Sequence, residues 1–222
     1  TSLPTVYQDV IAISRYARYI PEKQRRETWS ETVDRLINYL SYKTPQLLKE
    51  MPAIKKAVLN LEVMPSMRLL MTAGEACERD NISAYNCSYL AVNNKRAFSE
   101  ALYILMNGTG VGFSCEREET DQLPLIPDTL EEVDDVIVVE DSKLGWAKAF
   151  KKLLSSLWEG DIPTVDYSKV RPAGTRLKTF GGRASGHEPL KRLFDFTLDT
   201  FKEATGRNLY SIEVHDLSLI HI

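Results

Sequence analysis

The chain has 222 residues, 43% hydrophobic and 27% charged, which is typical of a globular protein able to bury a core without disulfides. The formal net charge of -3 argues against broad binding of nucleic acid, which needs a basic face. Three cysteines without a CxxC pair and three scattered histidines argue against a disulfide framework and a metal site. Because the sequence has no signal-peptide pattern and no apolar run of roughly 18 residues, we expect a cytoplasmic protein without membrane contacts.

Residues 1–60 predict a helical N-terminal region. Apolar residues recur at helical spacing up to Ile20, and Pro21 is expected to close that first helix. A second helix is predicted over residues 25–43, because its apolar side chains fall on one face.

From about residue 61 to residue 222, predicted strands alternate with predicted helices, which indicates an α/β core. A strand around Cys87 is followed by a helix that ends in a glycine-rich turn, and then by a second strand. The acidic segment 123–142 contains a strand-like VIVV and is interpreted as a hairpin or an insertion. The next helix has Ser142 as its predicted N-cap and Gly160 as its stop. A further strand leads into a glycine-rich loop, and another helix is expected over residues 189–206.

Two glycine-rich segments are candidates for ligand binding. In NGTGVGFS, Gly108, Gly110 and Gly112 would permit positive φ and close approach of a ligand to the backbone, although a turn needed only for packing has the same pattern. In RPAGTRLKTFGGRASG, four glycines lie among four cations and a phenylalanine. Cations can meet phosphate and an aromatic ring can stack on a base, so this pattern is typical of a nucleotide-sensing loop; a solvated surface loop is the alternative.

Cys87 lies in AYNCSYL, in the predicted strand. A lone cysteine is more often a small buried hydrophobe than a reactive thiol, so its composition and position do not by themselves assign it a role. The same holds for Cys77 and Cys115.

Five segments in order resemble the monomeric class II ribonucleotide reductases, which depend on adenosylcobalamin. They are RRETWSETVDR, MPSMRLLMTAG, AYNCSYLAV, NGTGVGFS and VRPAGTRLKTFGGRASGHEPL. The resemblance implies that a helical N-terminal region precedes the first part of a ten-stranded α/β barrel, with an effector-site insertion around residues 115–165. It also implies that only about the first third of the family's chain is present.

The family's chemistry replaces the ribose 2′-OH of a ribonucleotide with hydrogen, which supplies deoxyribonucleotides for DNA synthesis. A cysteine thiyl radical starts the reaction, and a cysteine pair donates reducing equivalents and becomes a disulfide. By resemblance, Cys87 is the first of that redox-active pair, and a thioredoxin-like or other dithiol reductant would restore it. The partner cysteine, the radical cysteine and the cobalamin-binding residues would lie beyond this chain.

The resemblance also implies two binding sites. Ser66, Asn86, Gly110 and Gly112 match positions beside the ribonucleotide substrate. A deoxynucleoside triphosphate effector would act through a specificity loop formed by Arg176, Lys178, Phe180, Gly181, Gly182, Arg183 and Gly186. Such a loop makes the enzyme allosteric, because an effector that favours one loop arrangement also favours one base. Whether the substrate is a diphosphate or a triphosphate remains open, with a ribonucleoside-triphosphate reductase as the expected activity.

The sequence is also consistent with two other hypotheses. One is a related reductase that uses a separate radical-generating subunit. The other is a non-catalytic nucleotide-binding regulatory module. The apolar ending EVHDLSLIHI leads us to expect that the chain is cut short, with its genuine sequence extending to about Leu217.

Overall fold

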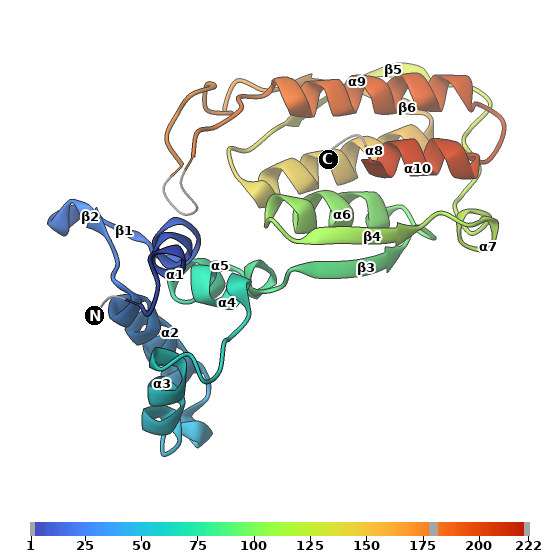
Figure 1. Cartoon of the computed structure of the whole chain (residues 1–222). Coiled ribbons are helices and arrows are strands. Elements are labelled where there is room, and N and C mark those ends of the chain that lie inside the picture. The colour runs from blue at the N-terminus through green and yellow to red at the C-terminus, as the bar shows by residue number, and fades with distance from the viewer. Residues whose placement is uncertain (1–2, 178–181, 220–222) are drawn as a thin grey trace. The chain divides into compact units, whose positions relative to one another are not determined.

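The computed structural model describes residues 3–177 and 182–219. The chain forms two compact units, Thr1–Asn86 and Cys87–Ile222. The first is mainly helical, whereas helices and strands alternate in the second (Figure 1). The sequence predicts this change at about residue 61, but helices continue to Ala84 and the first strand of the second unit begins at Cys87.

The first unit contains five α-helices and a small two-stranded sheet among its described residues. The α-helices are α1 (Val6–Ile11), α2 (Trp29–Lys43), α3 (Met51–Leu59), α4 (Met67–Thr72) and α5 (Glu75–Arg79). The π-helical turn η1 (Ala12–Tyr16) follows α1, and the 3-10 turns are η2 (Pro21–Lys23), η3 (Pro45–Leu47) and η4 (Asn81–Ala84). The short strands β1 (Tyr19–Ile20) and β2 (Arg25–Arg26) pair antiparallel.

Helix α2 forms the centre of the first unit, and its sequence explains why it begins at Trp29. Thr28 accepts a hydrogen bond from the backbone N–H of Glu31, and the Glu31 carboxylate accepts one from the backbone N–H of Thr28, which makes a capping box. The apolar face of α2 packs against α3 and α4. The buried residues of this core include Trp29, Val33, Leu36, Ile37, Met51, Val58 and Leu70. The predicted second helix is confirmed, four residues shorter at its start.

The predicted first helix is too long. Helix α1 ends at Ile11, one π-helical turn follows, and the backbone is extended from Ala17. The apolar spacing is misleading because Val10 and Ile13 are 56% and 50% exposed and do not contribute to the core. The chain leaves the helix where the backbone of Arg18 bonds with that of Glu27, with Glu27 N–H donating to the Arg18 carbonyl at 2.7 Å.

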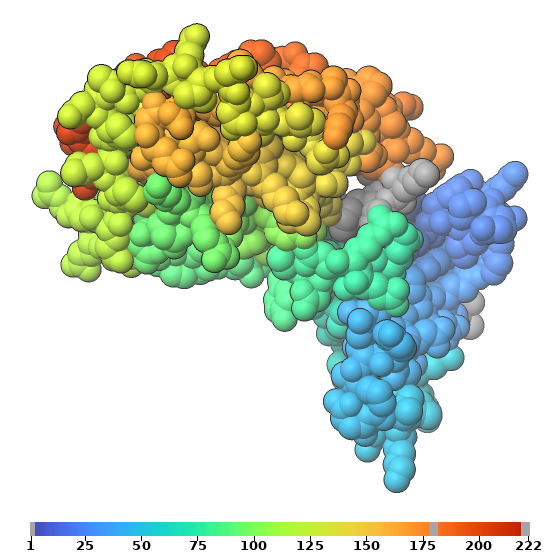
Figure 2. Space-filling model, turned by 180° about the vertical axis from the view of Figure 1, so that it is seen from behind, coloured from blue at the N-terminus to red at the C-terminus, as the bar shows by residue number. Residues whose placement is uncertain are grey.

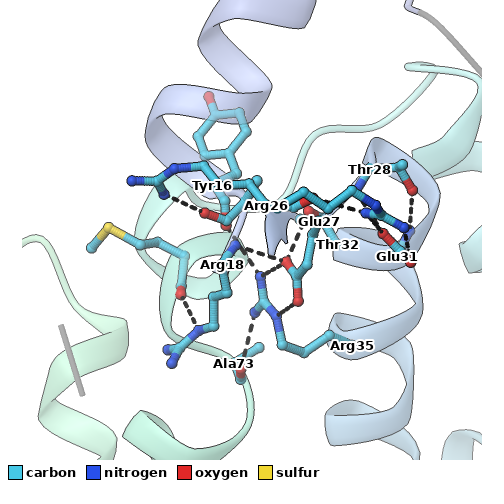
Figure 3. Close-up of polar contacts among 12 residues, drawn as sticks. Tyr16, Arg18, Arg26, Glu27, Thr28, Glu31, Thr32, Arg35 and Ala73 are labelled. Atoms are coloured by element: carbon cyan, nitrogen blue, oxygen red, sulfur yellow. Dashed lines mark hydrogen bonds and ion pairs between the residues drawn. The ribbon is translucent and has the colours of Figure 1, made fainter. Parts of the chain in front are cut away.

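The buried carboxylate of Glu27 and its partner Arg35 connect three parts of the first unit: the backbone at Arg18, helix α2 and the end of α4 (Figure 3). Its two oxygens accept hydrogen bonds from Nε and Nη2 of Arg35 at 2.8 and 2.9 Å, and also from Thr32 and the backbone of Arg18. Arg35 donates onward to the carbonyl of Ala73 at the end of α4. Burial alone would raise the pKa of Glu27, but the hydrogen bonds from Arg35, the Arg18 backbone and Thr32 hold this pKa below its ordinary value.

The second unit is built from two successive β-α-β units with parallel strands. In the first, α6 (Arg96–Met106) connects β3 (Cys87–Ala91) to β4 (Gly110–Ser114). In the second, α8 (Lys143–Glu159) connects β5 (Glu131–Val138) to β6 (Asp161–Asp166). The short helix α7 (Arg117–Thr120) lies between the two, and α9 (Glu188–Glu203) and α10 (Ser211–Leu219) follow. Figure 2 shows the segment from β5 to β6, yellow to orange, as one continuous face of this unit.

The interior of the second unit lies between its helices. Helix α6 packs on the β3–β4 pair and against α8, and α8 in turn contacts α9 and the β5–β6 pair. Large side chains fill this space, among them Phe98, Phe150, Leu154, Leu157 and Phe201. The core therefore covers one face of the β3–β4 pair.

Of the two interpretations of segment 123–142, a hairpin or an insertion, the hairpin is wrong. The first three residues of the VIVV run, Val136 to Val138, belong to β5, which pairs in parallel with β6 on the far side of α8 in the sequence. A hairpin would have required an antiparallel partner close in sequence. The segment instead begins a crossover, because the amphipathic helix that follows packs back on the strand pair.

Helix α8 itself is confirmed with both of its predicted ends. The Ser142 hydroxyl accepts a hydrogen bond from Gly145 N–H at 2.9 Å, and Gly160 ends the helix with a φ of 97°. Gly145 is required for packing, because a Cβ there would lie 2.5 Å from the Glu140 carbonyl oxygen. These signals are local, which explains why the sequence predicts this helix well.

The fold is therefore mixed α/β with small parallel strand pairs, as the sequence predicts at this coarse level. None of the helices among the described residues is both long and apolar enough to span a membrane.

Candidate active site

Cys87 begins β3, and its Cα partner on β4 is Gly110. The pairing continues two residues on, where Tyr89 lies opposite Gly112. Side chains alternate between the two faces of a strand, and parallel partners share a face, so these four residues lie on one side of the pair. The structure thus brings together three of the predicted site residues, Cys87, Gly110 and Gly112.

The two faces of the β3–β4 pair differ in exposure. Leu90 and Phe113 lie on one face, are partly buried and pack against the core of the second unit. Cys87, Tyr89, Gly110 and Gly112 lie on the other and are exposed. Cys87 is free and exposed, whereas Cys77 is buried and Cys115 is partly buried. Of the three thiols, that of Cys87 is therefore the most accessible to a ligand.

Of the two predicted reasons for glycine in the NGTGVGFS segment, a positive φ is found at only one position. Gly108 has a φ of 80°, whereas Gly110 and Gly112 have ordinary strand backbones. At Gly112 a Cβ would lie 3.7 Å from the Ser88 carbonyl oxygen, which is an ordinary contact. Neither backbone conformation nor packing requires glycine at 112, so the absence of a side chain there leaves open space above the strand pair.

Ser66 and Asn86 belong to the first unit. Ser66 is the N-cap of α4, and its hydroxyl accepts a hydrogen bond from Leu69 N–H at 3.2 Å. This capping role accounts for a serine at position 66 without any ligand. Asn86 is exposed and directly precedes Cys87 in the chain.

The second glycine-rich segment forms a narrow antiparallel arm on each side of residues 178–181. Arg176 and Arg183 form an isolated bridge, and Leu177 N–H donates to the Gly182 carbonyl at 3.0 Å. Arg183 also donates to the Gly174 carbonyl. The predicted loop residues Lys178, Phe180 and Gly181 lie outside the described residues.

Contacts fix the loop at both of its ends, Arg171 and Gly186. Arg171 Nε donates to both carboxylate oxygens of Asp141, at 2.8 and 3.0 Å, and this pairing lowers the pKa of Asp141. The sequence counts Arg171 among cations available for phosphate, but this pairing makes it an anchor of the loop. Gly186 is buried with a φ of 77°, and a Cβ there would lie 3.1 Å from the Ala173 backbone nitrogen.

An open pocket of about 540 Å³ lies beside the loop base. Its lining includes Tyr167, Pro172, Ala173, Ser185 and His187. The rings of Tyr167 and His187 stack with centroids 5.4 Å apart, and burial raises the pKa of the Tyr167 hydroxyl. Neither residue is predicted from the sequence, although aromatic and histidine side chains that flank a glycine-rich loop could indicate the wall of a pocket.

Comparison with curated proteins gives several matches. The chain is 26% identical to the adenosylcobalamin-dependent ribonucleoside-triphosphate reductase of Lactobacillus helveticus, over 91% of this chain and 37% of that protein. It is 25% identical to a probable enzyme of the same name from Dictyostelium discoideum, over 96% of this chain and 32% of that protein. A putative one from Mycobacterium phage D29 is 28% identical over 80% of this chain and 30% of that protein.

The predicted resemblance is confirmed. A crystal structure of a B12-dependent class II ribonucleotide reductase also matches, with a TM-score of 0.84 and 23% identity, over 96% of this chain and 39% of that chain. At this identity the structural match supports the fold. No protein-family model matches the chain.

The chain spans about a third of the length of the reductases it matches, from 30% to 39%. The structural match covers nearly all of this chain, and Cys87 lies on β3, the first strand of the second unit.

Proposed function

We propose that the chain is the amino-terminal part of an adenosylcobalamin-dependent ribonucleoside-triphosphate reductase. The observation that supports this most directly is an exposed free thiol, Cys87, in register with Gly110 on the open face of a parallel strand pair. The names of the curated relatives favour this function over a reductase with a separate radical-generating subunit and over a non-catalytic regulatory module.

The proposed reaction reduces a ribonucleotide by two electrons. The C2′–OH bond breaks, the hydroxyl leaves as water, and a C2′–H bond forms. Cys87 and a second cysteine outside this chain each give up a hydrogen, and their sulfurs join as a disulfide. A thioredoxin-like or other dithiol reductant would then exchange with that disulfide and restore both thiols.

Cys87 suits this role because its thiol is exposed and unpaired. An exposed thiol can approach the ribose and can protonate the leaving hydroxyl, and its sulfur can afterwards form the disulfide. A buried thiol such as that of Cys77 could not reach the ribose or a second cysteine without rearrangement of the fold.

The substrate would lie on the open face of β3 and β4. Gly110 and Gly112 leave the surface beside Cys87 free of side chains, so a ribose can approach the backbone closely. From the resemblance alone we also propose that Ser66 and Asn86 contact the ribonucleotide.

The glycine-rich arm would respond to a deoxynucleoside triphosphate effector and select the base of the substrate. Arg176, Lys178, Phe180, Gly181, Gly182, Arg183 and Gly186 are the proposed residues of this specificity loop. The contacts at Arg171 and Gly186 support this role. Because they fix the two ends of the loop, an effector that favours one arrangement of the loop could also favour one base at the substrate site. The segment around residues 115–165, which includes β5 and α8, would contribute the effector-site insertion.

Adenosylcobalamin, when bound, would supply the radical that starts the reaction. The described residues contain no group of three or more His, Cys, Asp or Glu side chains that could hold a metal ion, and we assign none of them to the cobalamin. In the complete protein, β3 and β4 would be the first strands of the ten-stranded barrel. All three cysteines are free, which suits a reducing cytoplasm.

The direct test is to assay the full-length protein that carries this chain. We expect it to convert ribonucleoside triphosphates to deoxyribonucleotides when adenosylcobalamin and a dithiol are both present, measured by chromatography of the products. Omission of the cofactor is the control. A folded full-length protein that binds ribonucleotides but forms no deoxyribonucleotide under these conditions would contradict the proposal.

A further inference from the structure

Tyr89 stands on the same open face as Cys87 and is 69% exposed. Its position on β3 is two residues beyond Cys87, which places the two Cα atoms roughly 6.6 Å apart along the strand. Its partner on β4 is Gly112, which has no side chain to cover the ring. A large exposed aromatic side chain therefore lies on the same face as the thiol, opposite two glycines of β4.

The surroundings of Tyr89 do not explain it as a core residue. The face that packs on the core carries Leu90 and Phe113, and Tyr89 points to the opposite face. Within residues 3–177 and 182–219, its hydroxyl has no hydrogen-bond partner. Two of the other exposed tyrosines have a cation beside the ring: Arg207 lies 4.0 Å from the ring centroid of Tyr210, and Lys43 lies 5.2 Å from that of Tyr42.

We propose that Tyr89 is a substrate-contacting residue, whose ring packs against the nucleoside part of the ribonucleotide while Cys87 faces the ribose. The proposal rests on the proposed function and adds a residue to its site. Gly110 and Gly112 form the floor, the Cys87 thiol lies at one end, and the Tyr89 ring forms a wall. An aromatic wall fits a nucleoside, because its base and the apolar face of its ribose can cover the exposed ring.

The test uses equilibrium binding to the full-length protein without the cofactor, measured by calorimetry. The ligands are a ribonucleoside triphosphate and inorganic tripolyphosphate, which lacks the nucleoside. We expect Tyr89→Ala to weaken nucleotide binding about 5- to 150-fold, the range for loss of a stacked aromatic ring. Tyr89→Phe, which keeps the ring, should bind within about threefold of the unaltered protein. Neither substitution should change the Kd for tripolyphosphate.

Two controls separate the possible failures. Tyr42→Ala removes another exposed tyrosine, on α2, and should leave the Kd for the nucleotide unchanged. If the unaltered protein binds no ribonucleotide, the proposed function fails together with this inference. If it binds and Tyr89→Ala binds equally well, or loses both ligands together with thermal stability, Tyr89 packs against protein and the inference alone is overturned.

Discussion

At the scale of single residues, exposure distinguishes the three cysteines. Cys77 is buried, and its sulfur donates to the Thr72 hydroxyl oxygen at 3.2 Å. Cys115 is partly buried after β4, and Cys87 alone among them is exposed. The sequence predicts the strand that carries Cys87 but not the face on which its thiol lies, because that depends on which side of the strand pair α6 covers.

The open space above Gly112 gives a prediction for a single methyl group. Gly112→Ala should fold normally, with a free energy of unfolding within about 1 kcal/mol of the unaltered protein, because the added Cβ meets only an ordinary contact. The same methyl should raise KM for the ribonucleotide about tenfold, since it would occupy space left for the ribose. Steady-state kinetics and thermal melts check the two parts, and an unchanged KM would remove Gly112 from the site.

The buried Glu27 carboxylate gives a prediction about stability and pH. Glu27→Gln should lower the free energy of unfolding at pH 7 by about 3 kcal/mol, because Arg35 would remain largely buried without its charge partner. The pKa of Glu27 is lowered from 4.5 in the folded state, so its contribution is complete above that pH and is lost as the pH falls through the folded value.

The difference between the two proteins should therefore shrink below pH 4.5, and urea unfolding at pH 7 and at lower pH measures it. The exposed Glu22→Gln is the matched control and should change little at any pH. A difference at Glu27 that stays constant with pH would show that the carboxylate charge is not what stabilises this part of the fold.

At the scale of elements, helices with signals close in sequence can be predicted, whereas the pairing of strands that lie far apart in the sequence cannot. The caps of α2 and α8 lie within a few residues of each helix, so the sequence predicts both helices closely. The pairing of β5 with β6 joins residues separated by the whole of α8, and the interpretation of this segment as a hairpin is therefore wrong. The predicted first helix is too long for a similar reason. The backbone hydrogen bond between Arg18 and Glu27, which draws the chain out of the helix, cannot be recognised from the spacing of apolar residues.

The glycine-rich arm gives a prediction at the same scale. Gly182 has a φ of 84°, and a Cβ added there would meet no atom within 4 Å, so Gly182→Val would strain the backbone without disturbing a neighbour. We expect this change to scramble the effector-dependent choice of base more than it lowers the overall rate. The measurement is reduction of four ribonucleotides in competition, with each effector in turn.

Gly174→Val is the matched control for strain. Gly174 also has a positive φ, 87°, with equally open surroundings, but it lies outside the proposed specificity residues. An unchanged pattern of base choice in Gly182→Val, or an equal disturbance in both variants, would mean that the arm only connects β6 to α9.

At the scale of the whole molecule, five short segments in the right order predict more than any single residue could. Cys87, NGTGVGFS and the glycine-rich loop are each ambiguous, yet their order predicts the resemblance that the comparisons confirm. The boundary between the units is harder to predict, because the helices after residue 61 contain too few residues for a clear period.

The most direct test of the proposed chemistry is the turnover of Cys87→Ser in the full-length protein. With a dithiol as reductant, we predict that this variant binds the ribonucleotide normally but loses multiple turnover, whereas Cys115→Ser, at a partly buried thiol near the same strand pair, keeps it. The measurement is the amount of deoxyribonucleotide formed per enzyme over many turnovers. Normal multiple turnover by Cys87→Ser would contradict the assignment of this thiol.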